Sequence, residues 1–283
     1  MKPAPFAYRK VRSLDEAVAL LGETPDARLL AGGQSLMATL NMRLSAPSLL
    51  IDINGLSGLD GIAHKNGQGS GFVEIGALAR HVQAERSATI AKLAPLIARA
   101  MPLVGHPAIR NRGTLGGSIA FADPAAELPA CLLALDGEVD AQGPKGKRTI
   151  KAGDYFKGLY ETALGPQEIL TAIRLPAADS NTRIGFAELA RRHGDYAIVG
   201  LAASARADGK GLKDVRLAYF GVGNTPLRAE KSEAALAHGD VDGAVAALDL
   251  DPHDDIQATG AVKKHLAGVL LRRVAAQLME QRP

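Results

Sequence analysis

The sequence predicts an α+β protein made of two domains. Its 283 residues are typical of about two domains, and the 47% hydrophobic content is enough to form sizeable cores. Strand-like and helix-like segments alternate through the first part of the chain, whereas three strand-like segments followed by two helices fill the last part. We therefore expect a larger mixed domain and a smaller α+β domain with a short antiparallel sheet and helices.

The N-terminal segment has the pattern of a βαβ-like unit. A helix is expected from Ser13 to Gly22, because Ser13 is a good N-cap, a glutamate follows three residues later, and a glycine ends the segment. The segments 27–30 and 47–53 are rich in strand-forming residues, and the segment 36–44 between them suits a helix. The expected order is therefore strand, glycine turn, helix, strand.

The middle of the chain is less regular. A strand is expected over 71–77, and a helical stretch over 80–101 with a break at Pro95. The segment 105–129 holds four glycines and three prolines around short apolar runs, so we expect it to be mostly loop. Further strands are expected over 132–141, from 149 towards 156, and over 169–176, with a turn at 143–146.

A domain boundary is expected near residue 177. Pro176 closes a strand, and the polar stretch 178–183 is typical of a linker. The first domain then comprises residues 1–177, with lobes of about 1–56 and 57–177, and the second comprises residues 178–283. Within the second domain we expect strands over 184–190, 197–205 and 215–222, and helices over 230–237 and 261–278. The last helix is amphipathic, so its apolar face packs on its own sheet or on a partner.

The composition argues against several classes of function. The net charge is only +3 and no basic block occurs, so nucleic acid is not expected as a partner. The single cysteine, Cys131, cannot hold an iron–sulfur cluster, and its apolar surroundings predict a buried side chain. No apolar run is long enough for a membrane span and no leader is recognisable, so we expect a cytoplasmic protein.

No metal site is expected on this chain. The histidines lack the spacing of metal ligands, and we expect each of them to be a surface or core residue. The histidines considered are His64, His81, His106 and His193.

A glycine turn between a strand and a helix is the first candidate binding site. It consists of Ala31, Gly32, Gly33, Gln34 and Ser35. Glycine tolerates positive φ and lets a ligand approach the main chain, so the N–H groups of this turn suit a diphosphate, with neutral donors added by the two polar side chains. A plain tight turn at the start of a helix is the alternative.

Two other phosphate-binding motifs are not favoured for this turn. The glycines lack the G-x-G-x-x-G spacing of a Rossmann site, and Asp52 is better explained as a strand-end or turn residue. A Walker-type loop is excluded because no Gly-Lys-Ser/Thr sequence follows.

A second glycine cluster repeats the same residue types. It consists of Thr114, Leu115, Gly116, Gly117 and Ser118. A long dinucleotide lying between two lobes would require donors from two such turns. Asp123 and Glu127 follow, and each of them either accepts hydrogen bonds from a ribose or adenine or pairs with Arg110 or Arg112 at the surface.

These motifs together resemble the FAD-binding medium subunits of the molybdenum hydroxylases, the family of carbon monoxide dehydrogenase and of the FAD domain of xanthine dehydrogenase. The resemblance covers essentially the whole chain. Its segments are Ala31–Leu36, Arg43–Leu44, Ile109–Asn111, Gly113–Ser118, Ala122–Pro129, Arg192–Ala197, Gly223–Leu227 and Ala267–Arg273.

The resemblance implies the fold and the cofactor. We expect a two-lobed FAD-binding domain of the PCMH (vanillyl-alcohol-oxidase-like) type, followed by a C-terminal domain of the carbon monoxide dehydrogenase flavoprotein type. Both glycine turns are implied to hold the FAD diphosphate, Glu127 to touch the nucleotide part, and Tyr196 to lie by the isoalloxazine. Without the resemblance, Tyr196 would be expected as a half-buried core residue.

Two positions depart from the pattern of the carbon monoxide enzyme and its relatives. Gln34 stands where the carbon monoxide enzyme carries His, and Ser118 where many relatives carry Asn. Both departures keep a polar donor, so they leave FAD binding expected and argue against carbon monoxide as the substrate.

The function implied is electron transfer within a larger oxidoreductase. Electrons from a molybdopterin cofactor on a large subunit pass through iron–sulfur clusters on a small subunit to FAD on this chain, and then to an external acceptor. We expect a heterotrimer or a dimer of heterotrimers, and no catalytic acid or base on this chain. The alternatives are a self-sufficient FAD-dependent oxidase or reductase and a non-catalytic nucleotide-binding assembly module.

Overall fold

The N-terminal lobe is a small parallel sheet with two helices. The computed structural model of the chain describes residues 2–209 and 211–280. The strand order is β1-β3-β2, and both pairs are parallel. The elements are β1 (Ala7–Lys10), α1 (Leu14–Glu23), β2 (Arg28–Leu30), α2 (Leu36–Asn41) and β3 (Leu49–Asp52). The expected N-cap is confirmed, because the Ser13 side chain accepts a hydrogen bond from the Glu16 N–H.

The second lobe is a five-stranded antiparallel sheet of order β4-β5-β10-β6-β7, with short helices packed on it. The strands are β4 (Ile62–Lys65), β5 (Phe72–Gly76), β6 (Glu138–Gly143), β7 (Gly146–Lys151) and β10 (Ile169–Pro176). The helices are α3 (His81–Arg86), α4 (Ala88–Leu93), α5 (Pro95–Ala100), α6 (Pro107–Arg110), α7 (Leu115–Phe121), α8 (Glu127–Ala134) and α9 (Ala152–Tyr155).

Three further short elements complete this lobe. A 3-10 turn (Met101–Leu103) follows α5, and the two-stranded ribbon of β8 (Phe156–Gly158) and β9 (Glu161–Thr162) follows α9. Helices α5, α7 and α8 bury their apolar residues against the sheet, in a core that includes Cys131 at 0% exposure. The expectation that this cysteine is buried is therefore confirmed.

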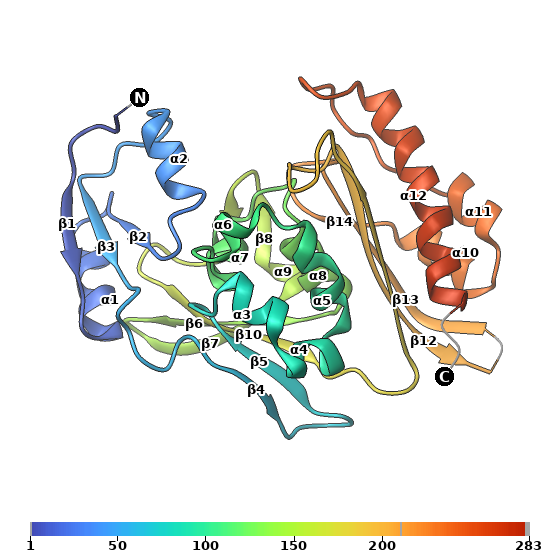
Figure 1. Cartoon of the computed structure of the whole chain (residues 1–283), viewed down its shortest axis with the longest axis horizontal. Coiled ribbons are helices and arrows are strands. Elements are labelled where there is room, and N and C mark those ends of the chain that lie inside the picture. Colours follow the sequence, from blue (N-terminus) through green and yellow to red (C-terminus); the bar gives the residue numbers. More distant parts are fainter. Residues whose placement is uncertain (1, 210, 281–283) are drawn as a thin grey trace.

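The C-terminal part is a four-stranded antiparallel sheet with three helices on one face (Figure 1). Its elements are β11 (Thr182–Leu189), β12 (Val199–Asp208), β13 (Gly211–Phe220), β14 (Leu227–Arg228), α10 (Glu230–Ala237), α11 (Val241–Ala246) and α12 (Gly260–Glu280). The apolar face of α12 packs on this sheet through residues such as Leu271 and Val274, which was one of the two expected roles.

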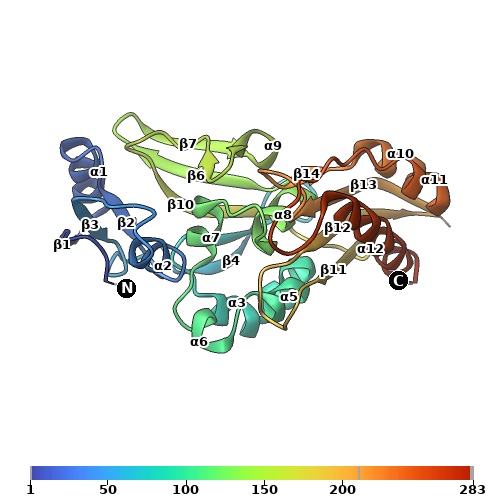
Figure 2. The same ribbon diagram turned by 90° about the horizontal axis from the view of Figure 1, so that it is seen from above.

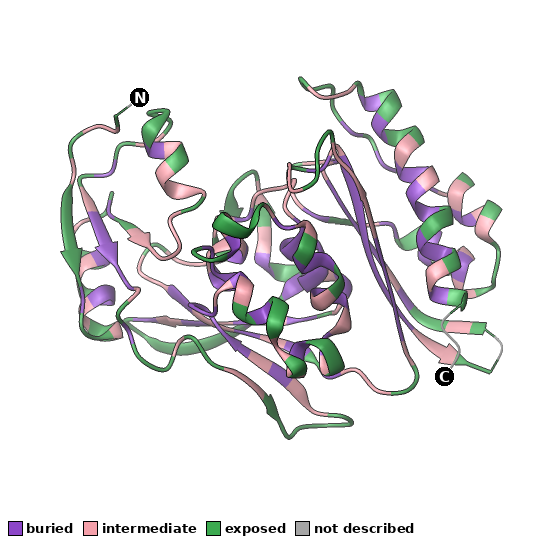
Figure 3. Ribbon diagram, viewed as in Figure 1, coloured by how far each residue is buried: buried purple, intermediate pink, exposed green. Residues whose placement is uncertain are grey.

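The C-terminal sheet is buried on both faces. Along β12, Leu201 and Ala203 belong to the core under the C-terminal helices, whereas Ala202 belongs to the core of the second lobe. Helix α8 lies on this second face, where the Ser204 hydroxyl donates to the Ala134 carbonyl at 2.6 Å. Figure 3 shows the resulting buried residues through the middle of β12 and β13. The sheet is thus a wall shared by two hydrophobic cores.

The N-terminal lobe and the C-terminal helices lie at opposite ends of the molecule, with the second lobe between them (Figures 1 and 2). The α+β class is confirmed, as are a βαβ-like unit at the start and an antiparallel sheet with helices at the end. Strand β10 ends at Pro176 and β11 begins at Thr182, and the division into domains near residue 177 stays a prediction. Among the described residues, none of the helices has the length and apolar character that crossing a membrane requires.

Two of the expected segments are wrong. The segment 105–129, expected as loop, contains α6, α7 and the start of α8, because its prolines and glycines stand where helices accept them: Pro107 is the first residue of α6. The strand expected over 132–141 starts only at Glu138, since the preceding apolar residues complete α8. A short, fully buried apolar run does not distinguish helix from strand by its periodicity.

Smaller differences concern breaks and short elements. The helical stretch 80–101 is interrupted at Ser87, which caps α4, as well as before Pro95. Helix α9 occupies residues 152–155, where a strand was expected to continue. Six short elements had no counterpart among the elements expected from the sequence: β1, β4, β8, β9, β14 and α11.

A glycine in the shared sheet supplies a test of its packing. Gly200 of β12 stands opposite Phe220 of β13, and a Cβ atom at Gly200 would overlap the Phe220 ring, which stacks on Phe186 at a centroid distance of 5.8 Å. We expect Gly200→Ala to lower the free energy of unfolding by about 1–3 kcal/mol, because the ring must leave its packed position. Denaturant unfolding of the full chain measures the change.

The matched control is Gly153→Ala in α9. A Cβ atom added at Gly153 would have no neighbour within 4 Å, so alanine there should leave the stability unchanged or slightly higher. Equal stability of the Gly200→Ala variant and the wild type would contradict this account of the sheet.

Candidate functional site

The first glycine turn connects β2 to α2 and carries a row of open main-chain donors. Gly33 has a φ of +73°, a conformation that favours glycine. The Gln34 side chain donates to the Gly32 carbonyl at 3.2 Å, so it closes the turn on itself. The N–H groups of residues 32–35 donate no hydrogen bond to any other described residue. Adjacent N–H groups at the start of a helix suit an anionic ligand.

The second glycine turn begins α7 and is hydrogen-bonded differently. The Leu115 N–H donates to the Ala79 carbonyl at 2.9 Å, and the Gly116 N–H to the Ala77 carbonyl at 3.0 Å. The N–H groups of Gly117 and Ser118 bond to the side chain and the carbonyl of Thr114. Unlike the first turn, this turn therefore uses its main-chain donors within the protein.

Close packing explains the glycine at position 116. A Cβ atom there would lie 2.5 Å from the Ala77 Cα, at the end of β5. Glycine therefore lets α7 approach the sheet closely enough for the two hydrogen bonds to Ala77 and Ala79. Position 116 requires glycine for packing, whereas position 33 requires it for backbone conformation.

The structure brings the two turns into direct contact. A Cβ atom on Gly32 would lie 2.6 Å from the Arg112 carbonyl oxygen and 2.7 Å from the Gly113 Cα. Main chain therefore meets main chain at this point, and a side chain at position 32 would force the turns apart. Residues more than 75 positions apart in the sequence thus form one continuous surface.

A buried histidine supports the second turn from below. His81 is 3% exposed, and its Nε2 lies 3.2 Å from the Ser118 Oγ, whereas its Nδ1 has no hydrogen-bond partner among the described residues. Burial lowers the pKa of His81 to about 4, so the ring is neutral at neutral pH.

An acidic cluster follows the second turn. The hydroxyl groups of Tyr160 and Tyr196 hydrogen-bond to Asp123, and Asp123 also caps the Ala125 N–H at 2.9 Å. Burial raises the pKa of Asp123. Tyr196 is 48% exposed and belongs to none of the hydrophobic cores, so it is not the core residue that it would otherwise be expected to be. The cluster therefore joins a carboxylate from the second lobe to a tyrosine from the loop between β11 and β12.

Two further acids lie deeper. Glu127 is 6% exposed at the first position of α8, and burial, with Asp123 as a smaller contribution, raises its pKa to about 7. Burial and the neighbouring Glu127 raise the pKa of Glu188 in β11 to about 8. Neither Asp123 nor Glu127 forms a salt bridge within the described residues, and Arg110 pairs with Glu85 at 3.0 Å. The expected alternative of surface pairs with Arg110 or Arg112 is therefore wrong.

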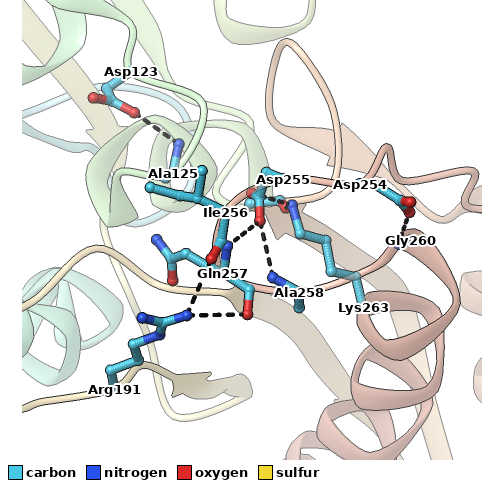
Figure 4. Close-up of polar contacts among 11 residues, drawn as sticks. Asp123, Ala125, Arg191, Asp254, Asp255, Ile256, Gln257, Ala258, Gly260 and Lys263 are labelled. Atoms are coloured by element: carbon cyan, nitrogen blue, oxygen red, sulfur yellow. Dashed lines mark hydrogen bonds and ion pairs between the residues drawn. The ribbon is translucent and has the colours of Figure 1, made fainter.

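A network of hydrogen bonds braces the segments around this cluster (Figure 4). The Gly221 N–H donates to the Pro124 carbonyl, and the nearly buried Lys263 ammonium bonds to the Gly221 carbonyl and to Asp255. Asp255 accepts from two N–H groups of the segment 255–258, and Arg191 donates to the carbonyls of this segment. The C-terminal residues thus fix the loops on either side of Asp123 and Tyr196.

The structure places the predicted site residues in two groups, the glycine turns and the acidic cluster. The turns 31–35 and 114–118 are adjacent, Asp123 and Tyr196 are hydrogen-bonded, and Glu127 lies behind them and faces Glu188. Asp52 ends β3 and accepts from the Asn54 N–H at 2.8 Å, as expected for a strand-end or turn residue. The described residues contain no group of three or more His, Cys, Asp or Glu side chains that could hold a metal ion.

Several residues of the site were not identified from the sequence. Tyr160 and Glu188 join the acidic cluster, Arg80 and Asn54 lie behind the turns, and His81 supports Ser118. None of them belongs to a recognisable motif, because each reaches the site through a tertiary contact. A polar residue in an otherwise apolar strand, such as Glu188, was the one available signal.

The sequence profile of the family described as "FAD binding domain in molybdopterin dehydrogenase" matches residues 4–178, and that described as "CO dehydrogenase flavoprotein C-terminal domain" matches residues 185–278. The 6-hydroxypseudooxynicotine dehydrogenase complex subunit alpha of Paenarthrobacter nicotinovorans is 36% identical, over 99% of this chain and 97% of the relative.

Two solved structures are also similar over almost their whole length. A carbon monoxide dehydrogenase chain from Hydrogenophaga pseudoflava superposes with a TM-score of 0.94 at 36% identity, covering 98% of both chains. A chain of quinoline 2-oxidoreductase from Pseudomonas putida 86 superposes with a TM-score of 0.92 at 33% identity, covering 99% of both chains.

The buried acid Glu127 generates a pH-dependent prediction. Its pKa is about 7 in the folded chain and near 4.5 when exposed, so the folded state holds the proton more tightly. The stability that this proton contributes is present below pH 4.5 and is lost as the pH rises through 7. We expect Glu127→Gln to be more stable relative to wild type at about pH 8 than at about pH 5, because glutamine has no proton to lose. Denaturant unfolding of both proteins at both pH values measures the difference in the free energy of unfolding.

The control is Glu23→Gln at an exposed position of α1, which also replaces a carboxyl group by an amide and should change the free energy of unfolding little at either pH value. A Glu127→Gln effect of the same size at both pH values would show that Glu127 is ionised in the folded chain and that this assignment is wrong.

Proposed function

Because this chain belongs to the family of FAD-binding subunits of molybdopterin dehydrogenases, we propose that it is the FAD-binding electron-transfer subunit of a multi-subunit molybdenum hydroxylase. The observation that carries the proposal is the row of open N–H groups at residues 32–35, in direct contact with the second glycine turn. FAD binding and an oxidoreductase role follow from the family.

The residues present fit an FAD molecule. A dinucleotide diphosphate requires several oriented donors and close approach to the main chain, and residues 32–35 combine free N–H groups with a glycine contact that a Cβ would block. The second turn contributes differently, since its own N–H groups are bonded internally and the Ser118 hydroxyl lies 3.2 Å from the His81 Nε2. The diphosphate is therefore met mainly by the first turn.

We assign the cofactor contacts to the predicted residues. The diphosphate contacts are Ala31, Gly32, Gly33, Gln34 and Ser35. The second turn, which consists of Thr114, Leu115, Gly116, Gly117 and Ser118, completes the diphosphate site and supports the first turn, because its main-chain donors are bonded within the protein. Asp123, held by two tyrosines, is placed to accept a hydrogen bond, and Tyr196 presents an exposed ring with its hydroxyl fixed. Glu127, which is buried behind Asp123, acts on the cofactor through the cluster rather than from the surface.

FAD, when bound, supplies the redox chemistry of accepting electrons from one side and releasing them to another acceptor. The chain's own residues bind and orient the cofactor. Main-chain donors hold the diphosphate, the hydrogen bonds of Asp123 fix the Tyr196 ring, and the network around Lys263 holds the loops that carry both residues. No general acid or base is required of this chain.

The partners follow from the same proposal. Relatives are subunits of dehydrogenase complexes by name, such as the 6-hydroxypseudooxynicotine dehydrogenase complex. We therefore place a molybdopterin cofactor on a large subunit and iron–sulfur clusters on a small subunit, in a cytoplasmic heterotrimer or a dimer of heterotrimers. The organic substrate is then bound by the large subunit.

A negative charge introduced at the first turn tests the assignment. We expect Gly33→Asp to abolish FAD retention, because the carboxylate repels the diphosphate and an aspartate at a φ of +73° strains the turn. The measurement is the visible spectrum of the purified chain and the amount of FAD released by acid, with and without added FAD. Gly117→Asp should behave alike.

Gly61→Asp is the matched control, since a Cβ atom added at Gly61 would have no neighbour within 4 Å and the φ of this residue lies outside the positive region. This variant should retain wild-type flavin. Wild-type flavin content in Gly33→Asp would refute the assigned turn.

A further inference from the structure

A polar network lies behind both glycine turns and involves residues outside every motif of the sequence. Asn54, just after β3, donates from its side-chain nitrogen to the Leu30 carbonyl at 3.2 Å and the Ala31 carbonyl at 2.7 Å. Asp52 also accepts from this nitrogen at 2.7 Å, and the Tyr8 hydroxyl hydrogen-bonds to Asp52. The Asn54 amide therefore holds the strand end from which the first turn begins.

Arg80 extends this network to the second turn. One guanidinium nitrogen donates to the Asn54 side-chain oxygen at 2.6 Å, and the other donates to the Arg112 carbonyl. These contacts fix the orientation of the Asn54 amide, because its oxygen must face the guanidinium donor and its nitrogen must face the carbonyl oxygens. The main chain adds a further link, since the His81 N–H donates to the Gly113 carbonyl at 3.0 Å.

The two ends of this network meet the contact between the turns. The Arg112 carbonyl that Arg80 holds is the atom that a Cβ on Gly32 would approach to 2.6 Å. The Ala31 carbonyl that Asn54 holds belongs to the residue before Gly32. Asn54 and Arg80 therefore connect the two main chains on both sides of their contact.

The charge of Arg80 is not neutralised by a neighbour. Both acceptors of its guanidinium are neutral, and no salt bridge of the described residues involves it. Burial, with Arg112 as a second cause, lowers the pKa of Arg80, and Asp52 acts on it only through space. An arginine with two fixed acceptors serves as a rigid fork between them.

We propose that Asn54 and Arg80 are positioning residues that set the spacing of the two glycine turns, and with it the affinity for the FAD diphosphate. This inference rests on the proposed function. A positioning role can be distinguished from a direct contact between Arg80 and the cofactor. If the two residues position the turns, removing the neutral Asn54 side chain weakens FAD binding as much as removing the Arg80 charge does.

The test compares three variants of the full chain, co-purified with its partner subunits if the chain alone holds no flavin. We expect Asn54→Ala and Arg80→Met each to raise the dissociation constant for FAD by about tenfold or more, and to weaken ADP equally. The double variant should lose little beyond the larger single effect, because both changes break one connection. Binding of riboflavin, which has no diphosphate, should stay at the wild-type level.

Arg86→Met is the matched control. Arg86 is exposed on the helix that Arg80 caps, and its side chain forms no hydrogen bond or salt bridge within the described residues, so its removal changes the net charge alone. This variant should bind FAD and ADP as the wild type does. If Arg80→Met fails to fold by circular dichroism, Arg80→Lys replaces it, because a lysine lacks the planar fork and should weaken FAD in the same direction.

Each other outcome overturns the proposal. A loss in Arg80→Met without a loss in Asn54→Ala would mean that Arg80 acts as a charge on the cofactor. Additive losses of FAD affinity in the double variant would mean that the two residues act separately. A loss of riboflavin affinity as large as the loss of FAD affinity would mean that the two residues merely stabilise the fold. A wild-type chain that binds no FAD even with its partners would refute the proposed function instead, so the two failures are distinguishable.

Discussion

The contact of main chain with main chain at Gly32 is the constraint on which the rest of the site depends. It exists only because position 32 has no side chain and because the carbonyl of Arg112 is held from behind. The contact joins the parallel sheet of the first lobe to the loops above the antiparallel sheet of the second. Any ligand that spans both lobes therefore meets a surface whose shape is fixed by backbone rather than by flexible side chains.

The two parts of the site differ in charge. The turns combine open N–H groups with Arg80 and Arg112, so the potential there is positive. In the acidic cluster, burial raises the pKa of Asp123, and it raises the pKa of Glu127 to about 7 and that of Glu188 to about 8, so much of the charge of these two glutamates is suppressed at neutral pH. A doubly charged diphosphate and an uncharged ring system would each meet the surroundings that suit them.

The sequence predicted the regular elements well where a local signal existed. The Ser13 cap, the strand over 169–176 and the helix over 230–237 follow from caps, strand formers and periodicity, and the structure has them. The segment 105–129 was mispredicted because its glycines serve close packing, as at Gly116, and packing is not visible in a single sequence. The places of Arg80, His81 and Glu188 in the site were not predicted for the same reason, since only the fold brings these residues to the site.

The sheet of β11 to β14, which is shared by two hydrophobic cores, restricts how the protein can change during evolution. Because Ala202 and Phe220 face one hydrophobic core and Leu201 and Tyr219 the other, removing either side would expose a full apolar face to water. The two halves therefore cannot be exchanged between relatives as independent modules. A substitution on one face of the sheet changes how the sheet packs against the core on its other face. The sequences of the two halves of the chain are therefore expected to change together during evolution.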